Sequence, residues 1–258
     1  MTAEQTLFFC ERLLSIAVAL QTIETIQLRR TWSENGIWRW STLQQRFQNP
    51  LYGLFFSTPG FYVVLIFRFL CALAIWFEPS PVFSGILFFT SWLISIRWRG
   101  LFNGGSDSMT LLVSLGLWGA RSFPDHPILM KASFAYIAVQ VTLSYFVAGW
   151  VKFINPEWRS GKAMSIFLKT PRYDSPPALI RQVFEHPKMA FTLSWLLICF
   201  ELTFPLAWAS PVLCLSFISL ALPFHLMVFW IFGLNRFVFA WLSAYPALYF
   251  WSQTLHLR

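Results

Sequence analysis

Residues 128 to 151 read ILMKASFAYIAVQVTLSYFVAGWV, a long and predominantly apolar run. A helix rises about 1.5 Å per residue, so a run of about 17 to 25 residues can cross the hydrocarbon layer of a membrane. The apolar residues do not alternate with polar ones, as they would in the strands of a membrane barrel. The run therefore predicts a transmembrane helix.

The rest of the chain has the same character. Of its 258 residues, 57% are hydrophobic, 19% are aromatic and 12% are charged, whereas a soluble domain has about 25% charged residues. We expect one domain over residues 1–258, an all-α polytopic membrane helical bundle of about eight transmembrane or partly re-entrant helices. The predicted spans are 7–28, 61–77, 82–96, 109–120, 128–151, 189–209, 211–234 and 236–251. The fourth is short for a crossing and the third is marginal, so these two are the candidates for re-entrant or tilted segments.

The net charge of +8 has a simple origin in the loops between these spans. If all eight cross, fourteen lysines and arginines fall on one side and three on the other, and Arg12 and Arg68 complete the 19. Basic loops face the cytoplasm, so both termini are expected outside. The charge thus indicates topology and contact with anionic membrane lipids, not nucleic acid. We expect an integral protein of a bacterial inner or intracytoplasmic membrane.

Two structured polar loops interrupt the predicted bundle. Residues 29–60 contain Trp32, Trp38 and Trp40, and indole rings prefer the membrane interface. Residues 155–188 contain five prolines, which exclude one long helix, although a short amphipathic helix around residues 161–168 is expected.

Arg12, Arg68, Glu201 and His225 are ionisable residues inside the predicted spans, where a charge is costly and usually has a partner. Counted from the outward ends at about 1.5 Å per residue, Arg12, Arg68 and Glu201 lie roughly 8, 14 and 12 Å deep. We expect them to form an intramembrane polar cluster in which Arg12 or Arg68 neutralises Glu201. Such a cluster either fixes the helix packing or forms a polar pocket for the head group of a lipophilic ligand.

His225 and Lys152 are the candidates for chemistry. His225 follows Pro223 in an apolar run, and either hydrogen-bonds a neighbouring helix or carries a proton to a quinone-like ligand. Lys152 directly follows the run quoted above, where its amine either reaches the lipid head groups or acts as a base. No second histidine stands at metal-ligand spacing, so no metal is expected.

The stretch from residue 145 to 161, YFVAGWVKFINPEWRSG, resembles a segment of the HTTM (horizontally transferred transmembrane) family, which includes the vitamin K-dependent gamma-carboxylase. The shared pattern is an apolar helix ending in Ala-Gly, a lysine three residues after the glycine, then a tryptophan and a glycine. Further similarity lies at Arg12, the turn Asn103-Gly104-Gly105 with Asp107, Glu201 ahead of Phe204-Pro205, and Phe224-His225 followed by Phe232-Gly233 and Phe237. The resemblance implies that Lys152 is a base, with His225 as a second catalytic candidate and a quinone-like or lipid ligand.

The sequence also departs from the carboxylase. It stops soon after Trp251, without a large lumenal region, so carboxylation of peptide glutamate is not expected. There is one residue more between Lys152 and Trp158, and the charge count places Lys152 at the cytoplasmic end of its helix, opposite to the carboxylase lysine. Two classes of function stay open: a membrane-embedded enzyme or maturation factor, and a non-catalytic subunit packed against other subunits of a bioenergetic or photosynthetic membrane complex.

Overall fold

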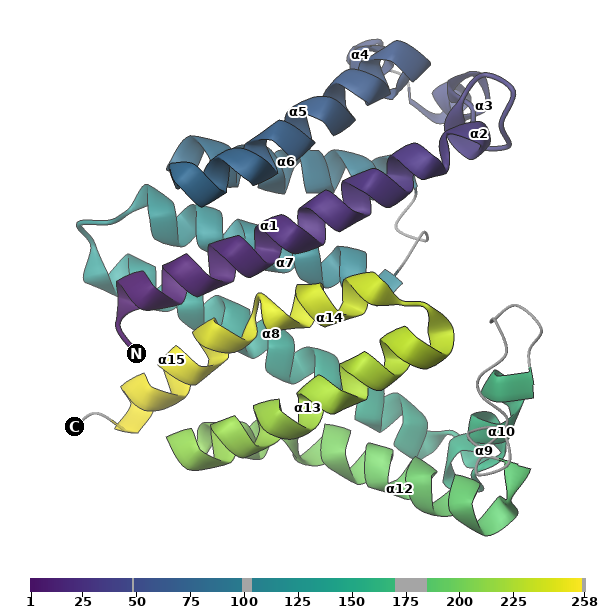
Figure 1. Ribbon diagram of the computed structural model, residues 1–258, viewed down its shortest axis with the longest axis vertical. Helices are drawn as coiled ribbons and strands as arrows, with labels where there is room; N and C mark the ends of the chain where they lie inside the picture. The colour runs from purple at the N-terminus through teal and green to yellow at the C-terminus, as the bar shows by residue number, and fades with distance from the viewer. Residues whose placement is uncertain (48, 99–103, 170–184, 257–258) are drawn as a thin grey trace. The chain divides into compact units, whose positions relative to one another are not determined.

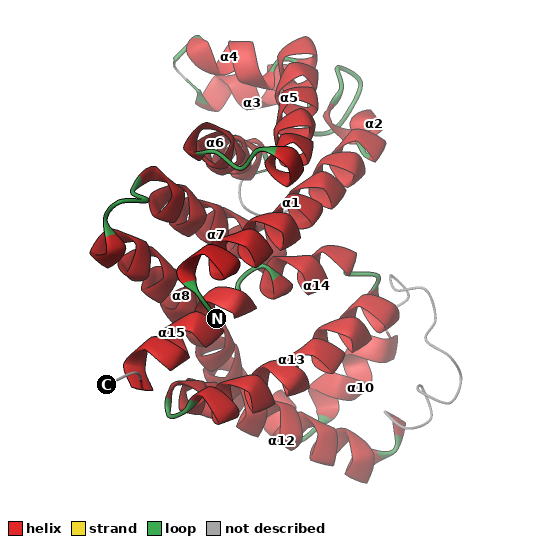
Figure 2. Ribbon diagram, turned by 60° about the vertical axis from the view of Figure 1, so that its left-hand side comes forward, coloured by secondary structure: helices red, strands yellow, loops and turns green. Residues whose placement is uncertain are grey.

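The computed structural model describes residues 1–47, 49–98, 104–169 and 185–256, and within these residues every regular element is a helix (Figures 1 and 2). The long helices are α1 (Ala3–Gln27), α5 (Thr58–Phe77), α6 (Pro81–Arg97), α7 (Gly104–Ser122), α8 (Pro127–Ile154), α12 (Pro187–Thr203) and α13 (Pro211–Phe232). The short ones are α2 (Arg29–Trp32), α3 (Trp40–Leu43), η1 (Gln44–Arg46), α4 (Leu51–Phe56), α9 (Pro156–Arg159), α10 (Lys162–Lys169), η2 (Phe204–Trp208), α14 (Asn235–Leu242) and α15 (Tyr245–His256). The predicted all-α class is confirmed.

Five helical segments in the described residues are long and apolar enough to cross a membrane: α1, α5, α8, α12 with η2, and α13. Helix α6 is apolar but has 17 residues. Helix α7 has 19 residues and is longer than predicted, so the fourth span is not the short segment expected from the sequence. The chain is an integral membrane protein with a polytopic helical bundle.

The eighth predicted span, residues 236–251, is wrong as a single helix. Helix α14 ends at Leu242, two residues form a turn, and α15 begins at Tyr245. The reason is Pro246, which has no N–H to donate to the carbonyl of Leu242 and whose ring crowds that carbonyl.

Serine and proline set the starts of three long helices. The hydroxyls of Ser57, Ser80 and Ser210 accept hydrogen bonds from backbone N–H groups three residues further on, and a proline occupies the first or second helical position of α5, α6 and α13. Serine caps free N–H groups at the start of a helix. Proline is tolerated there because an N–H in the first turn has no intrahelical acceptor, so its absence costs no hydrogen bond. Helix α13 ends at Gly233, whose φ of 66° is the left-handed conformation that glycine adopts without strain.

The chain divides into two compact units. The first comprises Met1–Ile137 and Phe239–Ala247. In it α6 packs on α7, and α1 packs on α5. Its core includes Trp32, which is fully buried, lies edge-on to Phe61 with ring centroids 5.0 Å apart, and donates from Nε1 to the carbonyl of Thr25 at 2.7 Å. Of the three tryptophans expected at the membrane interface, Trp32 thus belongs to the interior, whereas Trp38 and Trp40 are partly exposed.

The second unit comprises Ala138–Val238 and Leu248–Arg258. Here η2 packs on α13, and α9 and α10 pack on α12. Helix α10 confirms the short helix expected around residues 161–168. The prolines at 171, 176 and 177 lie outside the described residues.

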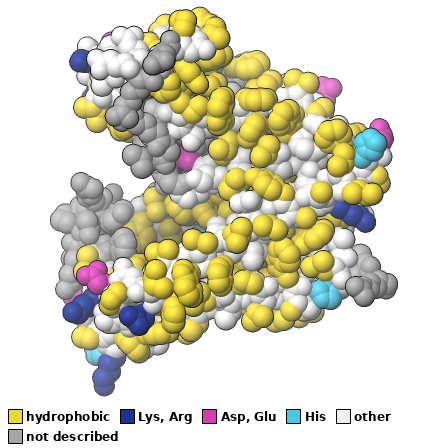
Figure 3. All heavy atoms as spheres, turned by 180° about the vertical axis from the view of Figure 1, so that it is seen from behind, with side chains coloured by type: hydrophobic (Ala, Val, Ile, Leu, Met, Phe, Trp, Pro, Cys, Tyr) yellow, Lys and Arg dark blue, Asp and Glu magenta, His cyan; other side chains and the backbone are white. Residues whose placement is uncertain are grey.

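Large apolar side chains cover much of the surface. Phe77, Ile128 and Val212 are exposed by 89%, 82% and 74%, and Figure 3 shows hydrophobic side chains spread widely over the described part of one face. Water-soluble proteins rarely expose contiguous apolar patches of this extent. Lipid tails are the medium in which such a surface is stable.

Candidate functional site

Lys152 and Glu201 form an ion pair in the second unit. The Lys152 Nζ donates to Glu201 Oε1 at 2.8 Å and to Oε2 at 2.7 Å. The two side chains are 17% and 3% exposed. The lysine therefore does not extend towards lipid head groups, which was one of the two alternatives for it.

Gly149 allows this pair to form. A Cβ at this position would lie 2.8 Å from the Glu201 Cβ and 2.8 Å from the Leu202 backbone nitrogen, closer than side chains tolerate. Helices α8 and α12 therefore approach each other at a glycine. Lys152 lies one turn further along α8, within reach of Glu201.

Two other residues of the 145–161 motif, Trp158 and Gly161, contact Lys152 or helix α12. The Trp158 ring centroid lies 5.3 Å from Lys152 Nζ, which is within the range of a cation–π interaction. The Trp158 carbonyl accepts from Ser194 Oγ at 2.5 Å and so ties α9 to α12. Gly161 has a φ of 77°, and a Cβ there would lie 2.6 Å from the Phe191 nitrogen. The motif thus describes how α8, α9 and α12 meet.

His225 also has a polar partner in this unit. Its Nε2 and the Tyr145 hydroxyl are 2.6 Å apart and share a hydrogen bond. The Tyr145 ring stacks on Phe204 with a centroid distance of 3.9 Å, and Phe224 and Phe237 lie beside the imidazole. Tyr145 precedes Lys152 by seven residues, or two turns, so both side chains leave the same face of α8.

The expectation that Arg12 or Arg68 neutralises Glu201 is wrong about the partner, because the cation is Lys152. Arg12 in the first unit donates to the backbone carbonyls of Phe8 and Trp76 at 3.4 and 3.2 Å, and its guanidinium lies over the Phe8 ring. Arg12 and Glu201 therefore each have their partners within their own unit.

Arg68 is fully buried in the first unit and belongs to a network of its own. Its guanidinium donates to the hydroxyls of Thr22 at 3.2 Å and Ser91 at 2.7 Å, and to Gln21 Oε1. The amide of Gln21 donates in turn to Asp107 Oδ1 at 2.6 Å. One glutamine thus bridges a buried arginine and an aspartate from the predicted motif.

The predicted turn at residues 103–105 is placed differently by the structure. Asn103 lies outside the described residues. Gly104 and Gly105 are the first residues of α7 and Asp107 lies in its first turn, so these three residues belong to the helix and not to a turn before it. A carboxylate in the first turn is favourable because the amino-terminal end of a helix carries partial positive charge.

Sequence reasoning did not select several residues that the structure brings to these networks. Tyr145 and Trp158 stood in the quoted motif without a role, and Gln21 was one polar residue in an apolar run. The ion pair between Arg121 and Glu11, with nitrogen–oxygen distances of 3.0 and 2.6 Å, was not expected either. The spacing of Tyr145 and Lys152 on one helical face was a signal available for the first of them.

Fold and site together define a polytopic helical membrane protein in which the buried Glu201 and His225 have polar partners on α8. The model of the HTTM domain family matches residues 124–253, which is half of the chain. The chain therefore belongs to the HTTM family, as the resemblance indicated. The matched segment contains Tyr145, Lys152, Glu201 and His225, whereas Arg12, Arg68 and Asp107 precede it. No curated protein and no solved structure matches the chain.

Proposed function

We propose that this protein is a membrane-embedded enzyme or maturation factor in which Lys152 and Glu201 perform acid–base chemistry on a lipophilic ligand of quinone or lipid type. The observation that carries the proposal is the contact of both carboxylate oxygens with the lysine amine, in a position where Glu201 is 3% exposed. A lysine needed only for contact with lipid head groups would not require a buried carboxylate.

The pair suits proton transfer for a physical reason. In a medium of low dielectric constant the charged form of an ion pair loses hydration, so its free energy approaches that of the neutral form. Movement of one proton from Lys152 to Glu201 leaves a neutral amine, which can accept a proton from an acidic hydroxyl of a ligand. Lysine performs this step and arginine does not, because guanidinium stays protonated.

Tyr145 and His225 support the same proposal. Phenol and imidazole joined at 2.6 Å can hand on a proton, because imidazole can accept a proton at one ring nitrogen and donate one from the other. The aromatic rings of Phe204, Phe224 and Phe237 provide apolar surroundings suited to a lipophilic molecule.

One observation favours the second class of function, a subunit of a larger membrane complex. Helix α13 is strongly apolar, yet only 17% of its most hydropathic window is buried. Such a helix can face either lipid or another protein, and a neighbouring subunit would cover it.

The test is to identify what the purified protein carries. We expect organic extracts of the protein from mild detergent to contain a lipophilic compound other than bulk phospholipid, detected by chromatography and mass spectrometry. Glu201→Gln should lower its amount, whereas Glu157→Gln, at an exposed position on α9, should not. If the wild type carries no such compound and instead co-migrates with cofactor-bearing subunits, the accessory role replaces the enzymatic one.

A further inference from the structure

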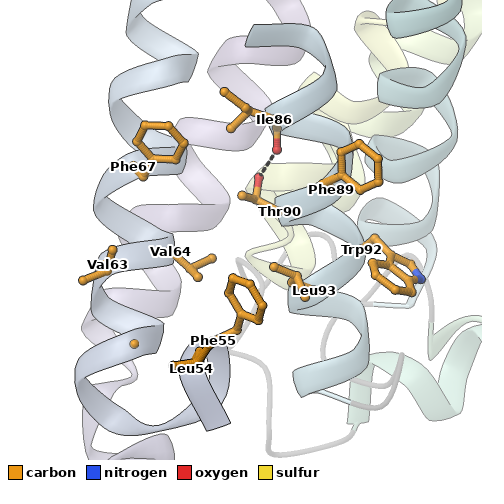
Figure 4. Close-up of a pocket in the computed structure, with 11 residues that line it drawn as sticks. Leu54, Phe55, Val63, Val64, Phe67, Ile86, Phe89, Thr90, Trp92 and Leu93 are labelled. Carbon is orange, nitrogen blue, oxygen red and sulfur yellow. Dashed lines mark hydrogen bonds between the residues drawn. The ribbon is translucent and has the colours of Figure 1, made fainter. Parts of the chain in front are cut away.

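Helices α4, α5 and α6 of the first unit form an apolar groove with a volume of about 490 Å³ (Figure 4). Its walls include Phe55, Val63, Phe67 and Phe89, and Thr90 is the one lining residue with a hydroxyl. That hydroxyl donates to the Ile86 carbonyl at 2.7 Å, so its proton is not directed to a ligand. Pockets for small ligands measure about 300 to 1,000 Å³, and this lining offers contact with hydrocarbon.

The groove occupies one half of the α5–α6 pair. It is lined by residues 60–67 from the beginning of α5 and residues 86–93 from the end of α6. Residues 78–80 join the two helices, so they run antiparallel and these halves lie at the same end. Val63 and Phe89 are 66% and 48% exposed, so the groove is open to the lipid around the helices.

The end of the helix pair nearest the groove is positively charged. The segment between α1 and α5 contains four arginines and a single acidic residue, Glu34, which accepts a hydrogen bond from Thr58 at 2.7 Å. Arg29, Arg30 and Arg39 of this segment are exposed. This segment packs on the same helix ends, because Trp32 lies edge-on to Phe61 of α5.

A buried arginine adds to this charge. Arg97 lies one turn beyond Leu93 of the groove wall, is fully buried, and donates from Nη2 to the Trp32 carbonyl at 3.1 Å. Within the described part of the chain its Nε and Nη1 have no hydrogen-bond partner. A cation in low-dielectric surroundings is poorly screened, so its field reaches the nearby membrane interface.

We propose that the groove binds an acyl chain of an anionic phospholipid, whose phosphate lies against Arg29, Arg30 and Arg39. The basic segment lies at the end of the helix pair nearest the groove. A phospholipid has its phosphate at one end and its acyl chains at the other, so the two features match its two parts. A neutral lipid would gain nothing from the arginines, and free phosphate would leave the groove unused. This inference is independent of the chemistry proposed for Lys152.

The experiment is native mass spectrometry of the full chain with phosphatidylglycerol or phosphatidylcholine of identical acyl chains. Phosphatidylglycerol should be retained preferentially. Arg29→Gln, Arg30→Gln and Arg39→Gln should each weaken this retention up to about fivefold, the usual effect of one interfacial cation on binding to an anionic lipid surface. Lys131→Gln, also at an exposed position, is the matched control and should have no effect.

A second pair of variants tests the groove. Val63→Trp places a large side chain in it and should lower the retention of phosphatidylglycerol, whereas Leu70→Trp, on α5 outside the groove and 55% exposed, should not. Phosphatidylglycerol with a photoreactive acyl chain should label peptides of residues 51–67 and 86–93 in the wild-type chain, which needs no variant to fold.

Three results would overturn the proposal. Equal retention of the two lipids would remove the requirement for an anionic head group. Displacement of phosphatidylglycerol by inorganic phosphate alone would show an anion site without an acyl-chain site. Photolabelling spread evenly over all lipid-facing helices would show bulk lipid contact.

Discussion

Lys152 and Glu201 are 49 positions apart in the sequence, yet the Lys152 amine lies within 2.8 Å of both oxygens of the Glu201 carboxylate. The contact joins α8 to α12 next to Gly149, where the two backbones approach closely because no Cβ intervenes. The motif at residues 145–161 therefore supplies only one side of a site between two helices. The other side, Glu201, is on α12.

Removal of one member of this pair should destabilise the protein. Lys152→Ala leaves the Glu201 carboxylate buried and unpaired, which costs about 3 to 5 kcal/mol in buried pairs. Thermal unfolding in detergent should show a lower midpoint. The double variant Lys152→Met with Glu201→Leu should recover much of the loss, and a double variant as unstable as Lys152→Ala would contradict the ion-pair explanation.

Gly149→Ala should destabilise the protein by about 1 to 3 kcal/mol, the usual cost of inserting a methyl group into a closely packed contact. The added Cβ would lie 2.8 Å from the backbone nitrogen of Leu202, which cannot move away as a side chain can. Gly53→Ala is the control, because a Cβ there would meet nothing closer than 3.8 Å. Comparable unfolding midpoints for the two variants would mean that α8 and α12 do not depend on this close approach.

Arg68→Lys should destabilise the first unit by about 2 kcal/mol or more, since hydrogen bonds to charged groups contribute about 1.5 to 3 kcal/mol each. The guanidinium bonds Thr22, Ser91 and Gln21 at once, and a compact ammonium cannot reach all three in the same geometry. Arg12→Lys, at a partly exposed position bonded to backbone carbonyls, should cost less. The two variants are compared by urea or thermal unfolding. Equal destabilisation by Arg68→Lys and Arg12→Lys would contradict the importance of the hydrogen bonds of Arg68.

Much of the fold was predictable because the length of an apolar run indicates a membrane span. Seven of the eight predicted spans each coincide with one long helix. The eighth was not, because apolar content hides the break that Pro246 introduces between α14 and α15. Hydropathy measures the preference of a residue for lipid, whereas this helix break depends on the backbone N–H that proline lacks.

The site was predictable in its members and not in its pairings. Glu201 and His225 were selected because charged or titratable groups are costly in a membrane, and Lys152 was selected because of the resemblance to the HTTM segment. Glu201 was assigned to the wrong cation, because counting depth along separate helices does not say which faces meet. Lys152 was counted with the loops and so was not considered as a partner, and the close approach at Gly149 that brings it to Glu201 exists only in three dimensions.

The distribution of basic residues predicts the orientation of the chain. A reporter fused after Leu168 should be cytoplasmic, and one fused after Arg258 should be external, since fourteen basic residues fall on the first side and three on the second. An external reporter after Leu168 would reverse this orientation and agree with the placement of the carboxylase lysine. Two cytoplasmic reporters would require an even number of crossings after that loop in place of the predicted three, and the broken segment α14–α15 is then the first candidate for a segment that does not cross.

Substitution of Lys152 by arginine separates an enzyme from an accessory subunit. Arginine keeps the positive charge and can bond both oxygens of Glu201, so the ion pair and the helix contact should persist. It cannot yield a neutral base. If Lys152 transfers protons, Lys152→Arg should accumulate in the membrane at the level of the wild type, unfold at a similar temperature, and lose the cellular function found for a deletion of the gene. Lys131→Arg, at an exposed position on α8, is the control for an arginine in this helix. Full function in Lys152→Arg, together with a loss of abundance in Lys152→Ala, would leave the pair as a structural contact and make the role of accessory subunit the better account.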